Sequence, residues 1–509
     1  MKLPINKDYD SEVCGSLPLH LVNHVQSYGF LLVLDYKEFK VVQCSENSSE
    51  FLNVDIDGIL GKPIEKLFSE GAFKEFYTKI EQRGSNDSIP FKTSLNGNDG
   101  SGFICNMTIH FKEKYFLLEI EPDSEVNNKS FSDVHRDLKY ILSSLKKGKD
   151  LEELTAIAAR EIRKFAGLDK VMIYQFDENW NGFVLAEDKI DSLESYLYLW
   201  FPASDVPRPA RELYLRNPYR LIPDRGFRPS KLMPVVNPLI NSFTDISDCN
   251  LRGVVAVHLE YLKNMNVQAS MSLPIIVNGK LWGLISCHHQ TACELSYEMR
   301  AVFELLADIL SSQISAIEKE KELSQMAIMS EKLAGIIEKL YSVDNIASAL
   351  LNEDTDILNL FGLDGVAIVI EGVTSAVGNV PGQKDINGVV HWLQRENIDK
   401  VFTTSSLVEY HYESIDYADI ASGLLAIPIS LRDGSYILGF RPEVVQNVRW
   451  GGNPEERVQM EKDGINYHPR SSFSVWQETV KHTSEPWSSR EIEIAEKLRV
   501  AILEKLVNV

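Results

Sequence analysis

The order of hydrophobic and polar positions predicts several strands in the first quarter of the chain. The stretch "YGFLLVLD" (28–35) is almost wholly apolar. Residues 103–111 alternate with a period of two, except that Ile104 places an apolar side chain on the polar side. Residues 115–121 are a further strand candidate. The polar stretch 122–133 that follows predicts a domain boundary.

The next part of the chain predicts a helix, a strand and then a long irregular segment. A helical pattern covers 138–165, and "KVMIYQFD" (170–177) is a strand candidate. Residues 201–250 are rich in proline and arginine and show little periodicity. Loops of this length are usually functional or disordered. Residues 270–289 then predict two apolar strands joined by a Val-Asn-Gly-Lys turn.

A long helical pattern occupies residues 301–342, which contain no proline and a single glycine. One continuous helix would span about 60 Å and would connect two domains. Two helices broken near 319–322 fit the same spacing. The last segment, 488–509, carries a glutamate three residues after Ser488, a capping pattern that predicts a helix reaching the terminus.

Length and composition indicate a globular protein of about three domains, because the chain has 509 residues of which 44% are hydrophobic and 25% charged. A formal charge of −21 argues against nucleic acid or an anionic membrane as the partner. No apolar run approaches the roughly 20 residues of a membrane helix, and the N-terminus lacks a signal-peptide core. Six scattered cysteines without a CxxC pair fit a reducing compartment, so we expect a cytoplasmic protein.

Polar chemistry is concentrated in four segments of the middle of the chain. The candidate residues are Asp205, Tyr214, Arg220, Arg252, His258, Tyr261, Ser270, Ser272 and His288. Two guanidinium groups with hydroxyls suit a ligand that has two carboxylate arms. A nucleotide phosphate also suits these groups, although a glycine-rich phosphate loop is missing. His258 would also fit as a buried core residue.

A zinc site is not expected in this region. Cys287, His288 and His289 are adjacent, whereas tetrahedral sites need spaced ligands. His258 and Glu260 match the first half of the zinc-deaminase pattern, but nothing matches its second half. We therefore expect no metal site.

These motifs resemble the photosensory core of bacterial phytochromes, and the resemblance covers nearly the whole chain. The residues that carry it are "FPASDVPRPARELYLRNPYR", "HLEYLKNM" and "LWGLISCHH". The resemblance implies an α+β fold with three domains, each a central antiparallel sheet flanked by helices, linked by long helices. It implies an N-terminal tail and PAS domain (1–130), a GAF domain (131–318) and a PHY domain (319–509). It also implies a figure-of-eight knot at the N-terminus.

The resemblance further implies a covalent chromophore, biliverdin IXα, held by a thioether to Cys14 in the N-terminal tail. In plant and many cyanobacterial relatives the attaching cysteine instead directly precedes the GAF histidine, a position that Val257 occupies here. The tail would thread through a lasso formed by part of the loop 224–250.

Roles for individual residues follow from the resemblance alone. The backbone carbonyl of Asp205 would accept pyrrole N–H bonds beside His258, and Arg220 and Arg252 would pair with the propionates. The other implied contacts are Val206 and Pro207 beside Asp205, Tyr214, Ser270 and Ser272 at the propionates, His288 at the D-ring carbonyl, and Met172, Tyr174, Tyr196, Phe201 and Tyr261 around the D-ring.

The segments "RWGGNPEE" (449–456) and "HPRSSFSVWQETV" (468–480) resemble the arms of the PHY tongue, which spans about 440–480. By the resemblance, Arg470 would pair with Asp205 at rest and Ser472 would take over after light. The pattern itself is ambiguous. Phe473, Trp476 and Val480 share a helical face, whereas alternate residues from Ser471 to Thr479 share a strand face. The segment therefore predicts either a bistable element or a plain strand.

The implied function is that of a red/far-red photoreceptor. Light would isomerise the C15=C16 bond of biliverdin, the tongue would refold, and the long helices of a parallel homodimer would carry the signal. We find no catalytic domain in the chain. The output would most often be a histidine kinase acting on a response regulator, with a diguanylate cyclase as the alternative.

Two other functions remain open on the sequence, a GAF/PAS regulator that binds a cyclic nucleotide or haem, and a zinc hydrolase.

The chain also departs from the family pattern at four places. These are Val22–Asn23, Ser27–Tyr28, Gly253 and Val255, and the last two replace serines.

Overall fold

The computed structural model describes residues 22–82, 84, 87–97, 102–123, 131–351, 357–456, 458–460 and 467–507. The described residues form two compact units. The first contains the chain up to Ser315 together with residues 450–476, and the second contains residues 316–449 and 477–507. The first unit carries two large sheets and a two-stranded one, and the second carries one sheet. All five described cysteines are free thiols.

The N-terminal sheet has seven strands in the order β1-β11-β3-β2-β6-β5-β4. Its strands are β1 (His24–Val25), β2 (Phe30–Asp35), β3 (Val41–Ser45), β4 (Ser88–Asn96), β5 (Gly102–Phe111), β6 (Tyr115–Pro122) and β11 (Ser230–Met233). The alternation predicted for β5 is confirmed, since Met107 and Ile109 are buried and Ile104 is 55% exposed. Three short helices cover the buried face, α2 (Ser48–Leu52), α3 (Ile56–Ile59) and α4 (Glu70–Glu81).

The opposite face of this sheet is covered by the long loop of the central domain. Leu117 on β6 packs with Ile246, Cys249 and Leu251 of that loop. Residues 24–26 are bonded to two parts of the loop. β1 pairs with β11, and the Gln26 N–H donates to the Leu251 carbonyl at 2.8 Å. The tail that was predicted to thread the loop lies outside the described residues.

The central sheet has eight strands in the order β10-β12-β13-β7-β8-β9-β19-β22. They are β7 (Lys170–Phe176), β8 (Gly182–Lys189), β9 (Trp200–Phe201), β10 (Arg220–Ile222), β12 (Ala269–Val277), β13 (Lys280–His289), β19 (Gln446–Gly451) and β22 (Val475–Val480). The predicted hairpin is confirmed, because β12 and β13 pair around Asn278 and Gly279. Both turn residues have positive φ, 52° and 73°, as a tight two-residue turn requires.

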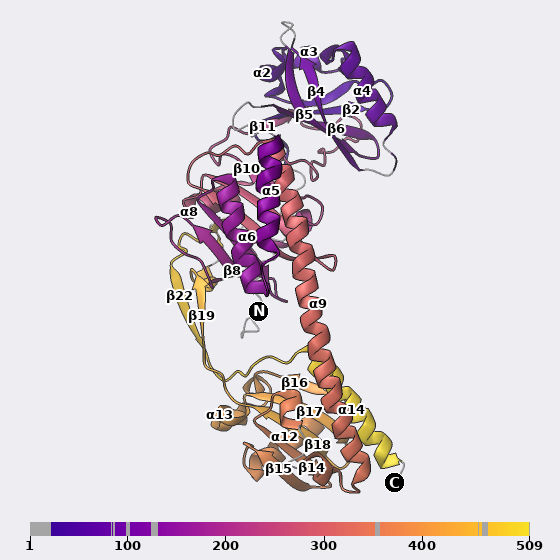
Figure 1. Ribbon diagram of the computed structural model, residues 1–509, viewed down its shortest axis with the longest axis vertical. Coiled ribbons are helices and arrows are strands. Elements are labelled where there is room, and N and C mark those ends of the chain that lie inside the picture. The colour runs from indigo at the N-terminus through magenta and orange to yellow at the C-terminus, as the bar shows by residue number, and fades with distance from the viewer. Residues whose placement is uncertain are drawn as a thin grey trace. The chain divides into compact units, whose positions relative to one another are not determined.

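The helical segment predicted over 138–165 is wrong as a single element. Two helices, α5 (Phe131–Leu145) and α6 (Leu151–Ala166), lie side by side (Figure 1). Gly148 lies at the break, where an added Cβ would come within 2.7 Å of the Leu154 Cα. The Asp150 side chain then caps the second helix by accepting the Glu153 N–H at 2.8 Å.

The long helix α9 (Tyr297–Ser342) is continuous over 46 residues, about 69 Å at 1.5 Å per residue. The single-helix prediction is therefore confirmed and the alternative of two helices is wrong. In the first unit α9 packs on the central domain. The Phe303 and Phe165 rings meet edge to face at 5.8 Å, and Ser311 accepts the Ile276 N–H at 3.0 Å.

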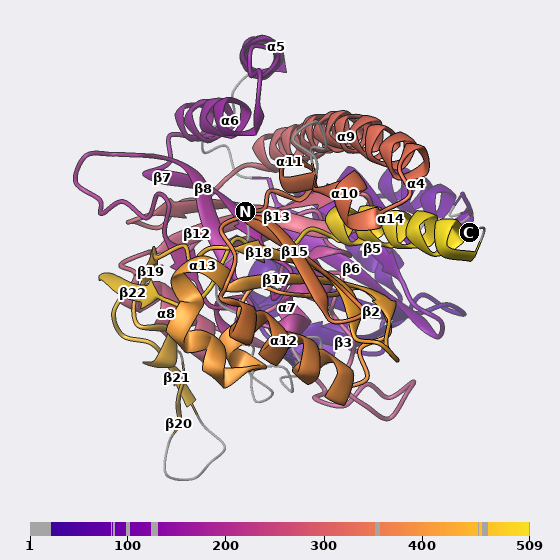
Figure 2. The ribbon, with the colours of Figure 1, turned by 90° about the horizontal axis from the view of Figure 1, so that it is seen from below.

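The second unit contains a five-stranded sheet in the order β15-β14-β18-β17-β16. Its elements are β14 (Gly365–Ile370), β15 (Val373–Gly378), β16 (Phe402–Thr404), β17 (Gly423–Ser430), β18 (Ser435–Arg441), α10 (Ile346–Leu350), α11 (Ile357–Phe361), α12 (Gln383–Arg395), α13 (Ala418–Ala421) and α14 (Ser489–Val507). Helix α12 covers one face, and α10, α14 and the end of α9 cover the other (Figure 2). The predicted cap is confirmed, because Ser488 and Glu491 bond each other's backbone N–H groups at 2.7 and 3.2 Å.

Two further short strands, β20 (Val458–Met460) and β21 (Tyr467–Pro469), pair with each other in the first unit. Short helices α7 (Arg208–Tyr214) and α8 (Ala256–Asn264) interrupt the irregular part of the central domain. Among the helices described, none combines the length and the apolar character that crossing a membrane requires.

Candidate functional site

A pocket opens in the central domain between α7, β10 and α8. Eight of the predicted residues line it, namely Asp205, Val206, Pro207, Tyr214, Arg220, Arg252, His258 and Tyr261. Local structure explains why they meet. Helix α7 begins after Pro207, and β10 aligns Arg220 with Ser272 on β12. Helix α8, which begins after Val255, carries His258 and Tyr261 one turn apart.

Arg220 and Arg252 form a cationic end of the pocket. Arg220 donates to the carbonyls of Asn250 and Gly253 at 3.1 and 2.8 Å, and Arg252 donates to the Ser247 carbonyl at 2.6 Å. Within the described part of the chain, neither guanidinium has a carboxylate at ion-pair distance. Burial and the charge of Arg252 lower the pKa of Arg220 to about 9. Two neighbouring cations that repel each other, Arg252 buried and Arg220 half-buried, favour a ligand with two negative charges.

Three predicted hydroxyl residues lie at or next to the same end, where Tyr214 lines the pocket and Ser270 and Ser272 lie on the neighbouring strand β12. Tyr214 shares a side-chain hydrogen bond with Ser272, directly beside Arg220. Ser270 lies opposite His288 across the β12–β13 ladder. The serines therefore connect the cationic end to a buried histidine.

The two predicted histidines, His288 buried and His258 half-buried in the pocket wall, are both uncharged at neutral pH. Burial, with a smaller contribution from Arg220, lowers the pKa of His258 to about 4. Burial, with Lys170 nearby, lowers the pKa of His288 to about 3. A neutral imidazole can both donate and accept a hydrogen bond, so each can contact a polar ligand without adding charge.

Asp205 forms a buried ion pair with Arg470 on the segment between β21 and β22, and their side chains are 6% and 2% exposed. The Tyr261 hydroxyl also donates to the Asp205 carboxylate, at 2.8 Å. Burial raises the pKa of Asp205, while Arg470 and Tyr261 oppose that rise. The Asp205–Arg470 ion pair holds residues 467–473 against the pocket. Asn264 adds to this by donating to the Arg470 carbonyl at 3.2 Å.

Aromatic side chains form an apolar wall next to this ion pair. The predicted wall residues Met172, Tyr174, Tyr196, Phe201 and Tyr261 belong to one buried cluster with Phe473. The Phe473 ring meets Tyr261 edge to face at 5.1 Å and lies 6.5 Å from Tyr196. The Arg470 guanidinium lies 4.7 Å from the centre of the Phe473 ring, within cation–π range.

A second cavity lies beyond this wall and is lined by Tyr196, His288, Ser472 and Phe473 among others. Ser472 is exposed on the segment that carries Arg470. Trp476 lies in β22, half-buried, and lines neither cavity.

Three protein-family models match the chain in order. They are "PAS fold" over residues 14–123, "GAF domain" over 150–314 and "Phytochrome region" over 330–508. The bacteriophytochrome of Xanthomonas campestris pv. campestris is 32% identical over 97% of this chain and 78% of its own length. The chain belongs to the phytochrome family. Members of this family are red/far-red photoreceptors, and this chain contains their three sensory domains.

Other phytochromes show how much of such a protein the chain represents. Cyanobacterial phytochrome B of Nostoc sp. is 35% identical over 97% of this chain, which spans only 66% of that protein. The Stigmatella aurantiaca phytochrome photosensory core module has a TM-score of 0.83 at 32% identity, covering 99% of this chain and 100% of that one. The chain is thus equivalent to a photosensory core, and family membership implies a bilin chromophore.

Several residues at this phytochrome pocket were not predicted from the sequence. Pro469 and Val22 line it, and Asn264 holds the backbone of Arg470. Glu260 on α8 also pairs with His468 at 2.8 Å. These contacts join segments about 200 residues apart, and no local pattern marks them. Cys14 lies outside the described residues, whereas Val22, eight positions later, reaches the pocket.

Proposed function

We propose that this chain senses red and far-red light by holding biliverdin IXα in the pocket between α7, β10 and α8. The observation that carries the proposal is the pair Arg220 and Arg252, which has no carboxylate partner among the described residues. Biliverdin has two propionate arms and an otherwise apolar conjugated skeleton. Its charges fit the cationic end, and its rings fit the aromatic wall.

The remaining donors and acceptors of the pocket also fit this ligand. Tyr214, Ser270 and Ser272 supply hydroxyls near the propionates. His258 is neutral at pH 7, so it can accept a hydrogen bond from a pyrrole N–H beside the Asp205 backbone carbonyl. His288 is also neutral and can donate to the carbonyl of the terminal D-ring. Val206 and Pro207 close the pocket beside Asp205.

Cys14 supplies the covalent attachment in this proposal. Eight residues span at most about 28 Å when extended, so a chain leaving Val22 at the pocket can return the thiol to it. The thiol adds across a vinyl group of the ligand. The sulfur bonds one vinyl carbon and the thiol proton ends on the other, so no further reactant is needed. Holding the two groups together supplies most of the rate.

Bound biliverdin would supply the photochemistry, which is absorption of red light and Z/E isomerisation at its C15=C16 bond. The protein's part is to confine the rotating ring with Met172, Tyr174, Tyr196, Phe201 and Tyr261 and to respond to its new position. The response we propose is release of Arg470 from Asp205, with Ser472 taking that place. Arg470 and Phe473 belong to one segment, so both would leave the pocket together as the tongue refolds.

The signal would then pass through α9 to a C-terminal output module. A 46-residue helix suits a parallel homodimer, the usual arrangement in this family. We propose a sensor histidine kinase acting on a response regulator as the whole protein, with a diguanylate cyclase as the alternative. Five free cysteines among the described residues support a reducing, cytoplasmic setting.

Assembly with biliverdin tests the ligand and its attachment together. The purified chain should bind one equivalent and gain a strong red absorbance band. A denaturing gel soaked in zinc should show bilin fluorescence on the chain. Cys14→Ala should keep the absorbance and lose the fluorescent band, whereas Cys293→Ala should keep both. A chain that gains no red band would overturn the proposal, and a band that persists in Cys14→Ala would overturn the attachment site.

A further inference from the structure

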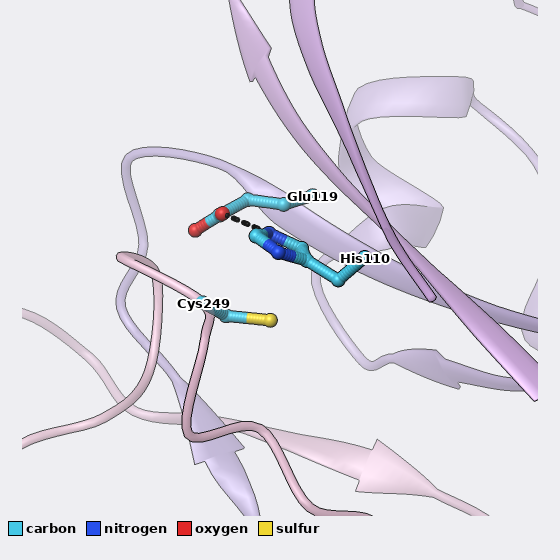
Figure 3. Close-up of side chains that lie close together, drawn as sticks. All are labelled: His110, Glu119 and Cys249. Carbon is cyan, nitrogen blue, oxygen red and sulfur yellow. Dashed lines mark hydrogen bonds and ion pairs between the residues drawn. The ribbon is translucent and has the colours of Figure 1, made fainter. Parts of the chain in front are cut away.

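Three metal-ligating side chains converge between the N-terminal sheet and the long loop of the central domain. They are His110 on β5, Glu119 on β6 and Cys249 in the loop, and one ligand atom from each lies within 4.8 Å of the others (Figure 3). All three are buried, with exposed fractions of 4%, 3% and 1%. No other such group occurs among the residues that the structure describes.

Strand register explains why the three meet. His110 lies opposite Leu117 and Glu119 lies opposite Thr108, so both side chains project from the face of the sheet that the loop covers. Leu117 and Cys249 belong to the buried cluster on that face. The cluster is therefore enclosed by a sheet on one side and a loop on the other.

One of the potential metal-ligating atoms in this cluster makes no hydrogen bond to the described residues. The imidazole Nε2 of His110 and a Glu119 carboxylate oxygen are 2.8 Å apart, and the other oxygen accepts the Leu251 N–H at 2.5 Å. The buried Nδ1 of His110 has no partner among the described residues. Such an atom has lost the hydrogen bond that it would make in water, which destabilises the fold unless a ligand replaces it. Figure 3 shows the imidazole and the Cys249 sulfur in the same small space.

We propose that His110, Glu119 and Cys249 bind a zinc ion that stabilises the loop against the N-terminal sheet. Imidazole, carboxylate and thiolate are all ligands of Zn²⁺, and three protein ligands leave a fourth position for water. Bonds of about 2.0–2.3 Å set tetrahedral ligand atoms roughly 3.3–3.8 Å apart. Ligand atoms that lie up to 4.8 Å apart must therefore draw together by about 1 Å, and the 2.8 Å contact between His110 and Glu119 must rearrange.

The charges balance when the ion binds. Cys249 gives up its thiol proton to solvent as the sulfur bonds the metal, so thiolate and carboxylate together neutralise Zn²⁺. Burial raises the pKa of the free Cys249 thiol, so the metal must displace a proton that is held tightly. The nearby charged groups are Lys112, which pairs with Asp245 and Asp248, and Arg252. Their charges nearly cancel, which leaves the ion to be neutralised by its ligands.

The site would act on the phytochrome pocket from its edge. Cys249 also lines that pocket, and Arg252 follows three residues later. An ion bound to Cys249 would fix the part of the loop that presents Arg252. No local motif marks these three residues as ligands, because they are dispersed along the chain and only the fold brings them together.

Metal binding can be measured on the full chain prepared without biliverdin, whose ring nitrogens also bind zinc. A Cys14→Ala background removes the thiol of the tail. After chelation under reducing conditions, Zn²⁺ is titrated in competition with a chromophoric chelator. We expect one tight equivalent, lost in Cys249→Ala and retained in Cys44→Ala, an equally buried cysteine of the N-terminal sheet. Equal binding by the Cys249→Ala chain and its parent would overturn the proposal.

X-ray absorption at the zinc edge provides a test that does not depend on a variant folding. The parent chain with one equivalent should show one sulfur and otherwise nitrogen or oxygen ligands. A spectrum without sulfur would overturn the site, as would failure of the parent chain to bind zinc at all. Light sensing is not part of either readout, so these results leave the proposed photoreceptor function untouched.

Discussion

Arg470 and Asp205 are 265 residues apart in the sequence and form an ion pair that excludes water from both partners. Asp205 belongs to the short turn before α7, whereas Arg470 belongs to the segment between β21 and β22. The Tyr261 hydroxyl donates to the same carboxylate, and the Phe473 ring meets the Tyr261 ring edge to face. The contact thus joins the tongue to the pocket through one charge pair and one aromatic pair.

Arg470→Ala should release the tongue from the pocket. Removing one partner of a buried pair leaves the other charge uncompensated, at a cost of about 3–5 kcal/mol. We expect faster hydrogen exchange at the backbone amides of β21 and residues 470–473, with the N-terminal sheet unchanged. Arg449→Ala, an exposed arginine of β19, is the matched control.

A double-mutant cycle identifies the partner. In the Arg470→Ala chain, Asp205→Asn should cost less stability than it does in the parent chain. The carboxylate charge that it removes is already unpaired there. Additive effects on exchange would show that the two residues act separately and would contradict the account.

Replacing Arg220 should affect the stability of the bilin-free chain and the binding of biliverdin in opposite ways. Arg220→Met should leave the stability of the bilin-free chain unchanged or raise it, because it removes a half-buried charge next to Arg252. The same change should weaken biliverdin binding by roughly tenfold or more, the value of a charge-assisted hydrogen bond. Chemical unfolding and a fluorescence titration measure the two effects. Arg208→Met, on the exposed side of α7, should change neither.

Esterification provides an independent check of the same charge pairing. The parent chain should prefer biliverdin over its dimethyl ester, which lacks the two negative charges. Arg220→Met should lose part of that preference. An equal affinity of the parent chain for the acid and the ester would show that the arginines do not bind the propionates.

Burial of His258 predicts a pH dependence for the bilin-free chain. Its folded pKa of about 4 lies below the ordinary histidine value of 6.5, so between these two pH values the unfolded chain binds a proton that the folded chain does not. The stability from this group is complete above about pH 6.5 and is lost as the pH falls towards 4, roughly 3 kcal/mol in all. Urea unfolding at pH 7 and pH 5 measures the loss.

His258→Gln should reduce that loss, whereas His391→Gln, an exposed histidine of α12, should not. The comparison matters because other buried groups titrate in the same range. If the parent and His258→Gln chains lose equal stability between pH 7 and pH 5, His258 is not buried in its neutral form.

Gly253 replaces a serine of the family pattern, and the structure gives a reason. A Cβ at this position would lie 2.1 Å from the His24 ring. Gly253→Ser should therefore lower stability by about 1–3 kcal/mol, as overpacking does. His24→Ala should restore only part of it in the double variant, because the His24 carbonyl oxygen lies 2.7 Å from the same Cβ and remains. Thermal unfolding of the four chains measures this, and a serine variant as stable as the parent would refute it.

Local chemistry allowed part of this fold to be predicted. The Asn278–Gly279 turn, the alternation of β5 and the Ser488 cap each depend on neighbouring residues, and each was confirmed. The break at Gly148 was missed because apolar spacing continues across it. The helix-or-strand ambiguity of 471–480 is resolved as strand β22 from Val475, with half-buried and exposed residues alternating.

The pocket could be predicted only through its resemblance to a known family. The residues that line it were found because "PASDVP" and "HLEYLKNM" are distinctive motifs. Contacts such as Asn264 with Arg470, and the convergence of His110, Glu119 and Cys249, depend on tertiary pairing across more than 100 residues. No periodicity or spacing in one sequence encodes them.

The most direct measurement is the absorbance of the biliverdin-loaded chain before and after red and far-red light. We expect one colour of light to change the absorbance spectrum and the other colour to reverse that change, repeatedly and without loss of chromophore. Arg470→Ala should still bind biliverdin and should alter the extent or lifetime of the light-induced state. A loaded chain whose spectrum does not respond to either colour would contradict the central claim.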